Sequence, residues 1–147
     1  DSDIPFFTAA YDLGAVLINT TDTETLLHGD LHHWNVMRSP SQGWLAIDPK
    51  GIIGDPAYDF GNIFHNPAGS DELTNTQAIM FRRSSEFARI SGYDQKRIVG
   101  FAFTRVALAA ASQQTRYNTS KDKSHMKARD RFMSYCETLS KVYRAIP

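Results

Sequence analysis

The polar residues between positions 28 and 35 are the ones in this sequence best suited to chemistry. An acid, Asp30, and an amide, Asn35, share this segment with three histidines, and a second acid, Asp48, follows Asn35 by 13 residues. Apolar residues flank both polar clusters. Since apolar residues tend to be buried, such flanks hold the carboxylates at the mouth of a core, and we take these residues as a candidate active site.

Phosphoryl transfer is the first chemistry that fits this spacing. It needs a carboxylate near the attacking hydroxyl and oxygen ligands for Mg²⁺. His28, Asp30 and Asn35 have the spacing of a kinase catalytic loop, in which Asp30 would face the hydroxyl. Asn35 and Asp48 would supply the hard oxygen ligands that Mg²⁺ prefers. The expected cofactors are therefore ATP and Mg²⁺.

A metal-dependent hydrolase is the alternative interpretation, because histidine is the commonest zinc ligand. Its candidate ligands lie within six residues: His28, Asp30, His32 and His33. The rest of the sequence offers two further histidines and no second ligand cluster, so phosphoryl transfer is favoured. Without a metal, one of the two adjacent histidines would pack inward, and His28 would brace the loop through backbone near Asp48.

Apolar spacing and capping residues predict a mainly α-helical single domain, residues 1–147, with one small hairpin at its active face. The helix that follows Asp94 is apolar nearly all round and should be the central buried one. Residues 51–56 should form a loop. The predicted helices cover residues 4–19, 56–66, 71–91, 95–117 and 122–146.

The predicted hairpin brings the candidate site together. Short strands at residues 36–37 and 44–47 flank a Ser/Pro/Gly turn at residues 39–43. Asn35 precedes the first strand and Asp48 follows the second, so both should lie at the same end of the hairpin.

Composition indicates an ordinary globular protein, with 41% hydrophobic and 22% charged residues. The single cysteine cannot form an internal disulfide, which suggests a reducing compartment such as the cytoplasm. No apolar run is long enough to cross a membrane.

Charge is uneven along the chain. Residues 1–72 carry eleven acids and two basic residues, whereas residues 73–147 carry five acids and fourteen basic residues. The basic residues are scattered, which favours solvated helix faces packed on an acidic first half over a nucleic-acid site.

Three segments closely resemble the aminoglycoside phosphotransferases: residues 28–36 (HGDLHHWNV), 46–51 (AIDPKG) and 54–59 (GDPAYD). The likeness is strongest to the streptomycin 6-kinase and hydroxyurea phosphotransferase branch, and residues 100–108 share it. The resemblance implies a kinase-like fold of two lobes. No Gly-rich phosphate loop, five-stranded sheet or phosphate-binding lysine precedes residue 28, so the chain is expected to be the helical carboxy-terminal lobe alone.

The resemblance also implies residue roles. Asp30 would be the catalytic base or the acid that orients the hydroxyl, and Asn35 and Asp48 would hold magnesium. Met37 and Ile47 would line the floor under the adenine.

Two interpretations are open for most of the remaining polar residues. Asp59 would accept backbone N–H groups from the catalytic loop, or it is an ordinary first-turn helix acid. Asp71 and Glu72 could bind a polycationic acceptor or cap the next helix. Lys50 is expected to be a surface loop lysine, although its place beside Asp48 leaves a phosphate contact open. Arg105, inside an apolar helix, should be a buried ion-pair partner.

The sequence thus predicts an ATP-dependent O-phosphotransferase acting on a small-molecule hydroxyl. The acceptor would be a streptomycin-like aminoglycoside or hydroxyurea, and the activity would confer antibiotic resistance. The alternative is a non-catalytic kinase-like lobe that binds a ligand or a partner. No nucleic acid or membrane partner is expected, and the sequence does not identify the acceptor.

Overall fold

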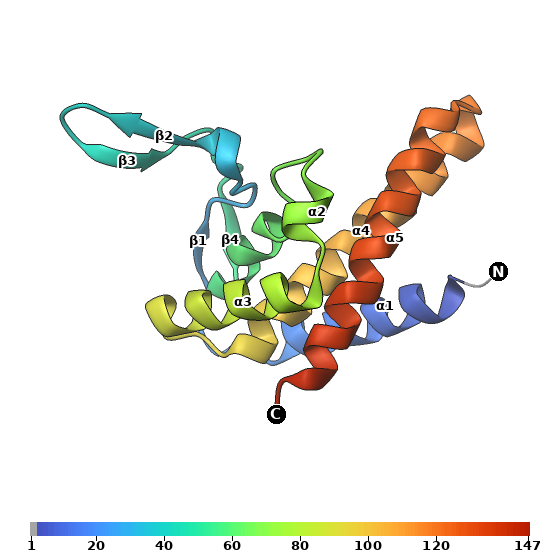
Figure 1. Ribbon diagram of the computed structural model, residues 1–147. Coiled ribbons are helices and arrows are strands. Elements are labelled where there is room, and N and C mark those ends of the chain that lie inside the picture. Colours follow the sequence, from blue (N-terminus) through green and yellow to red (C-terminus); the bar gives the residue numbers. More distant parts are fainter. Residues whose placement is uncertain (1–2) are drawn as a thin grey trace.

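A long helix, α4 (Gln95–Ser120), is the element on which the others pack in the computed structural model, which describes residues 3–147 (Figure 1). Asp94 caps it by accepting the backbone N–H of Arg97. Residues such as Ile98, Val99 and Val106 are fully buried. The prediction of a central buried helix is therefore confirmed.

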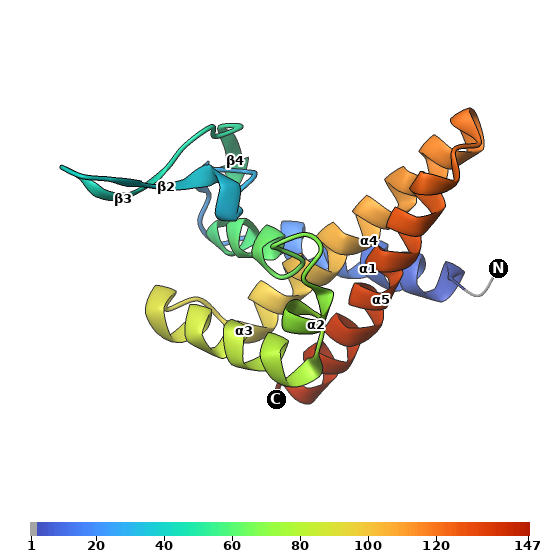
Figure 2. The ribbon, with the colours of Figure 1, turned by 45° about the horizontal axis from the view of Figure 1, so that its top comes forward.

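Two further long helices contact α4. α1 (Ile4–Asn19) and α5 (Lys123–Ala145) have nearly the predicted bounds, and α5 lies beside α4 along much of its length (Figures 1 and 2). Asp122 caps α5 by accepting the backbone N–H of Ser124. No helix within residues 3–147 is long and apolar enough to cross a membrane.

The helix predicted over residues 71–91 is wrong in one respect, because two helices occupy this segment. α2 (Asp71–Thr74) ends at Asn75, and α3 (Gln77–Ser91) begins anew. The side chain of Thr76 accepts the backbone N–H of Ile79, so Thr76 caps a separate helix. Gly92 caps the end of α3 with a φ of 78°, a left-handed conformation that glycine adopts readily.

The segment predicted as a helix over residues 56–66 is instead a shorter 3₁₀ helix, η2 (Pro56–Ile63). Asp55 caps it by accepting the backbone N–H of Ala57. A Cβ on Gly61 would lie 3.2 Å from the carbonyl oxygen of Phe101, so glycine permits η2 to approach α4 closely. Side chains three residues apart eclipse in a 3₁₀ helix, which turns Asp59 and Asn62 to one side.

The predicted hairpin is confirmed. β2 (Val36–Ser39) pairs antiparallel with β3 (Gly43–Ala46), with Val36 opposite Ala46. A short 3₁₀ turn, η1 (His33–Asn35), leads into it. In both views the hairpin projects away from the helices (Figures 1 and 2).

The prediction of a loop over residues 51–56 is wrong in part. β4 (Ile52–Gly54) pairs antiparallel with β1 (Thr25–Leu27), which precedes the candidate site in the chain. Leu26 lies opposite Ile53 and Leu27 opposite Ile52. This second two-stranded sheet joins the beginning and the end of the segment that carries the candidate site.

Ion pairs connect the acidic first half of the chain to the basic second half. The four arginines involved have side chains only 18–23% exposed, so these four do not form the solvated faces that the charge pattern predicted. The pairs are Asp3–Arg129, Asp30–Arg105, Asp55–Arg97 and Asp71–Arg131.

Truncating Ile98 tests the importance of α4 for stability. Ile98 is fully buried, whereas Ile90 on α3 is 72% exposed and provides a matched control. We expect Ile98→Ala to lower the free energy of unfolding by about 2–5 kcal/mol, because it leaves a cavity. Ile90→Ala should change it by no more than about 0.5 kcal/mol. Urea unfolding measures both, and equal effects would contradict the packing described.

Candidate active site

The loop that follows β1 is fastened to η2 by one carboxylate. The two oxygens of Asp59 accept the backbone N–H groups of His28 and Gly29, each at 2.8 Å. Gly29 has a φ of 78°, and a Cβ there would lie 3.2 Å from the side chains of both Lys50 and Ile52. Glycine therefore suits both the backbone conformation and the space.

His28 links this loop to the segment after the hairpin. Its Nδ1 accepts the backbone N–H of Asp30 at 3.2 Å, so the ring proton belongs on Nε2. Nε2 then donates to the carbonyl oxygen of Ile47, 2.8 Å away. The histidine thereby connects Asp30 to the residue just before Asp48.

Three groups from different parts of the chain contact the Asp30 carboxylate. Asn62 of η2 donates to Oδ1 at 3.0 Å, and the Arg105 guanidinium of α4 lies 3.3 Å from the same oxygen. The Lys50 ammonium lies 2.9 Å from Oδ2. Arg105 is thus the ion-pair partner that was expected, with Asp30 as the acid.

Electrostatics keep Asp30 ionised. Burial raises the pKa of its carboxyl group, but the hydrogen bond and positive charge of Lys50 lower it, as do His32 and Arg105. The lowering contributions prevail, so the pKa of Asp30 lies below its usual range.

The residues predicted to bind magnesium flank the hairpin at its base. The backbone N–H of Ile47, the residue before Asp48, donates to the carbonyl oxygen of Asn35 at 2.9 Å. The Asn35 amide nitrogen donates to the backbone oxygen of Asp30 at 3.0 Å. Its Oδ1 accepts no hydrogen bond from residues 3–147.

Asp48 is exposed and has a φ of 57°, a left-handed conformation that aspartate adopts more readily than most residues. A carboxylate and an amide oxygen fit Mg²⁺ well. In contrast, the described residues contain no cluster of three or more His, Cys, Asp or Glu that could hold a metal. His33 is exposed and His32 half-buried.

The other predicted site residues lie in different surroundings. Met37 in β2 is 54% exposed and Ile47 is 37% exposed, so both offer apolar surface near the hairpin. Asp71 accepts hydrogen bonds from Arg131 at 2.8 Å and from the Tyr135 hydroxyl at 3.0 Å. Its carboxylate is therefore already engaged, whereas Glu72 is exposed.

Sequence reasoning missed Asn62 and the contact of Lys50 with Asp30. Asn62 is only 6% exposed. Its spacing of three residues from Asp59 signals a shared face only if η2 is known to be a 3₁₀ helix. The Lys50 contact depends on the pairing of β1 with β4, which brings the Lys50 N–H to 2.7 Å from the His28 carbonyl oxygen.

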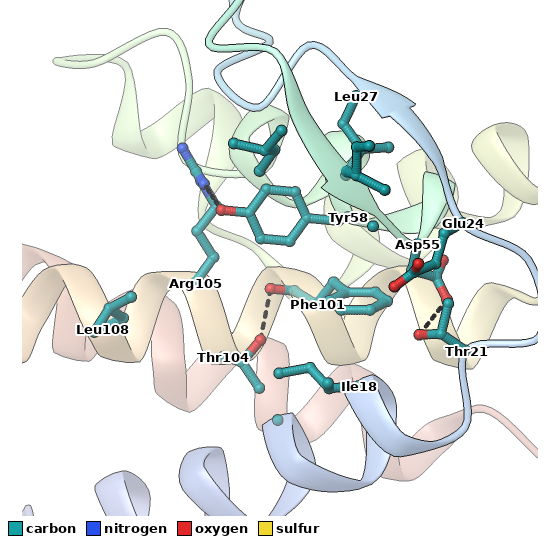
Figure 3. A pocket seen from close by; sticks show the side chains of 14 residues that line it. Ile18, Thr21, Glu24, Leu27, Asp55, Tyr58, Phe101, Thr104, Arg105 and Leu108 are labelled. Carbon is teal, nitrogen blue, oxygen red and sulfur yellow. Dashed lines mark hydrogen bonds between the residues drawn. The ribbon is translucent and has the colours of Figure 1, made fainter.

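A cavity of about 460 Å³, also not predicted, lies between α1, the β1–β4 sheet, η2 and α4. Figure 3 shows Ile18, Tyr58, Phe101 and Arg105 around it, with Arg105 donating a hydrogen bond to the Tyr58 hydroxyl. Asp30 does not line it, but Arg105 both lines this cavity and contacts Asp30.

Comparison with known proteins identifies similar sequences. The sequence profile described as aminoglycoside/hydroxyurea antibiotic resistance kinase matches residues 3–116. A streptomycin 3″-kinase of Klebsiella pneumoniae is 39% identical over 88 residues, which are 58% of this chain and 33% of the kinase. A streptomycin 6-kinase of Streptomyces glaucescens is 30% identical over 89 residues, or 56% of this chain and 27% of that protein.

A hydroxyurea phosphotransferase of Kitasatospora aureofaciens is 50% identical over 36 residues, covering 24% of this chain and 11% of the transferase. The chain thus spans about a third or less of the length of the curated relatives it matches. No solved structure matches it significantly. The resemblance inferred from the three motifs is confirmed.

Asp59→Asn tests how the loop is fastened. An amide has only one acceptor oxygen, so one of the two backbone N–H groups loses its partner and faces an NH₂ group. We expect amide hydrogen exchange at His28 and Gly29 to accelerate by about tenfold or more, the equivalent of one hydrogen bond to a charged group. Asp22→Asn, in an exposed loop, is the control and should change neither rate. Unaltered exchange in the Asp59 variant would contradict the bracing.

His65 should make stability depend on pH. Burial lowers the pKa of its imidazole to about 4, helped by the charges of Arg105 and Arg131. Between that value and the ordinary pKa of about 6.5, the unfolded chain binds more protons than the folded one. Stability should therefore fall as the pH drops from about 6.5 to 4.

His65→Phe keeps a ring against Phe132 and removes this titration. The slope of unfolding free energy against pH should then become flatter between pH 4 and 6.5. Urea unfolding at several pH values measures the slope. The same slope in both proteins would exclude His65 as its source.

Proposed function

Because this chain belongs to the family of aminoglycoside/hydroxyurea antibiotic resistance kinases, we propose that it is the catalytic lobe of an ATP-dependent O-phosphotransferase. The supporting observation is the arrangement of Asp30: Asn62 and Arg105 hold its carboxylate, and its backbone oxygen accepts a hydrogen bond from Asn35, one of the two proposed oxygen ligands. Phosphoryl transfer requires this combination of an oriented carboxylate and nearby hard oxygen ligands.

The proposed acceptor is a hydroxyl group of a small molecule. The relatives include proteins named streptomycin kinases and a hydroxyurea phosphotransferase, so we propose a streptomycin-like aminoglycoside or hydroxyurea. Modification of such a compound in the cytoplasm would confer resistance. Of the two acids proposed to bind a polycation, Glu72 is exposed, whereas Asp71 already forms an ion pair with Arg131.

Asp30 orients the acceptor in this proposal. Since Asn62 and Arg105 hold Oδ1, the acceptor hydroxyl donates to Oδ2. The hydroxyl oxygen forms a bond to the γ-phosphorus while the bond from that phosphorus to the bridging oxygen breaks. The electron pair of the broken bond remains with ADP, and the hydroxyl proton passes to Asp30.

The other proposed residues hold the nucleotide. Asn35 Oδ1 and the Asp48 carboxylate would bind Mg²⁺, which when bound neutralises charge on the β- and γ-phosphates. Met37 and Ile47 would contact the adenine from below through their exposed apolar side chains.

Two alanine variants of the full-length protein test this division of roles. Asp30→Ala should reduce phosphorylation of streptomycin or hydroxyurea by about 10²–10⁴-fold while leaving the affinity for Mg·ATP largely intact. Asp48→Ala should weaken Mg·ATP binding by about tenfold or more, because a charged ligand is lost. A coupled kinase assay and calorimetry measure the two quantities.

Turnover close to that of the wild type in Asp30→Ala would contradict the role of Asp30, and unchanged nucleotide affinity in Asp48→Ala would contradict that of Asp48. A wild-type protein that binds a ligand or partner but transfers no phosphate would favour the alternative, a non-catalytic lobe.

A further inference from the structure

The two oxygens of Asp30 have very different partners. Oδ1 contacts Asn62, which is 6% exposed, and Arg105, whose side chain is 18% exposed. Oδ2 meets only the Lys50 ammonium, at 2.9 Å, among the partners that residues 3–147 provide. The Lys50 side chain is 60% exposed. One side of the carboxylate is therefore fixed, and the other faces a cation open to solvent.

Lys50 combines a fixed backbone with a movable charge. Its N–H donates to the His28 carbonyl oxygen at 2.7 Å, and its Cβ lies close to Gly29. An ion pair this exposed to solvent contributes little to the stability of a protein. The ammonium can consequently leave Asp30 for a more highly charged anion at little cost, while the backbone stays in place.

The surroundings of Lys50 suggest which anion that is. Asp48, a proposed magnesium ligand, lies two residues before it, and Asn35 contacts the backbone of Asp30. A phosphoryl group that passes from a nucleotide at Asn35 and Asp48 to a hydroxyl at Asp30 would arrive close to Oδ2, the oxygen that the Lys50 ammonium contacts. In a loose transition state, negative charge is spread over the equatorial oxygens of that group.

We propose that Lys50 is a catalytic residue that binds the transferred phosphoryl group. It rests on Asp30 before the substrates bind and moves to the non-bridging oxygens of the γ-phosphate when they do. The move frees Oδ2 for the acceptor hydroxyl. The ammonium stabilises the transferring group electrostatically and keeps its own protons. This inference rests on the proposed phosphotransferase function.

Nucleotides with and without a γ-phosphate test the proposal in the full-length protein. Calorimetry would compare Mg·AMPPNP with Mg·ADP for the wild type, Lys50→Met, Lys50→Arg and Lys127→Met. Lys127 is exposed on α5 and serves as the matched control. Lys50→Met should weaken Mg·AMPPNP binding by about tenfold or more and leave Mg·ADP binding unchanged. Lys50→Arg should recover most of the loss, and Lys127→Met should resemble the wild type.

Turnover provides the second measurement. Lys50→Met should lower kcat by about tenfold or more while the KM for the acceptor stays the same, since the contact is made to the transferring group. Equal weakening of both nucleotides would indicate a merely structural lysine. Unchanged nucleotide binding, or a raised kcat, would mean that Lys50 only pairs with Asp30 in the absence of substrates and takes no part in the transfer. Either result overturns the proposal.

Failure of the underlying function would look different. The wild type would then neither bind Mg·AMPPNP nor transfer phosphate, which overturns both proposals together. A wild type that binds and transfers, compared with a Lys50→Met variant that does so equally well, overturns the role of Lys50 alone.

Discussion

The two hydrogen bonds from the backbone of His28 and Gly29 to Asp59 are the constraint on which the candidate site depends. Residues 28–32 have no helix or strand of their own, so their backbone N–H groups need partners from elsewhere. Asp59 supplies both acceptors for His28 and Gly29. The 3₁₀ geometry of η2 then places Asn62 on the same face as Asp59, where it reaches Asp30. One short helix thus sets both the path of the loop and the direction of its acid.

The uneven charge of the sequence acquires a structural meaning. Acids from the first half lie on loops and short elements, and arginines from the second half lie on the long helices α4 and α5. Arg97 illustrates the effect, because it contacts the cap residue Asp55 and also donates to the carbonyl oxygen of Leu17 at the end of α1. Breaking such a largely buried pair by removing one partner is costly. Ion pairs between the acids of the first half and the arginines of the second half therefore hold the two halves of the chain together.

The sequence predicted what depends on local signals and missed what depends on distant pairing. The long helices follow from apolar spacing and from caps such as Asp94 and Asp122, and the hairpin follows from its turn. In contrast, β4 consists of two isoleucines and a glycine, too short for any periodic pattern. Only its pairing with β1, 25 or more residues earlier in the chain, makes it a strand. The contact of Lys50 with Asp30 depends on the same pairing, so it could not be predicted either.

The charges around Asp30 bear on how it acts in the proposed reaction. Burial raises the pKa of this carboxyl group, yet Lys50, His32 and Arg105 together bring it below its usual range. A carboxylate whose pKa lies below its usual range is a weaker base than an ordinary carboxylate. A loose transition state requires little proton removal before the bond to phosphorus forms. In the proposed reaction, the positively charged surroundings of Asp30 therefore suit orientation of the acceptor hydroxyl better than early removal of its proton.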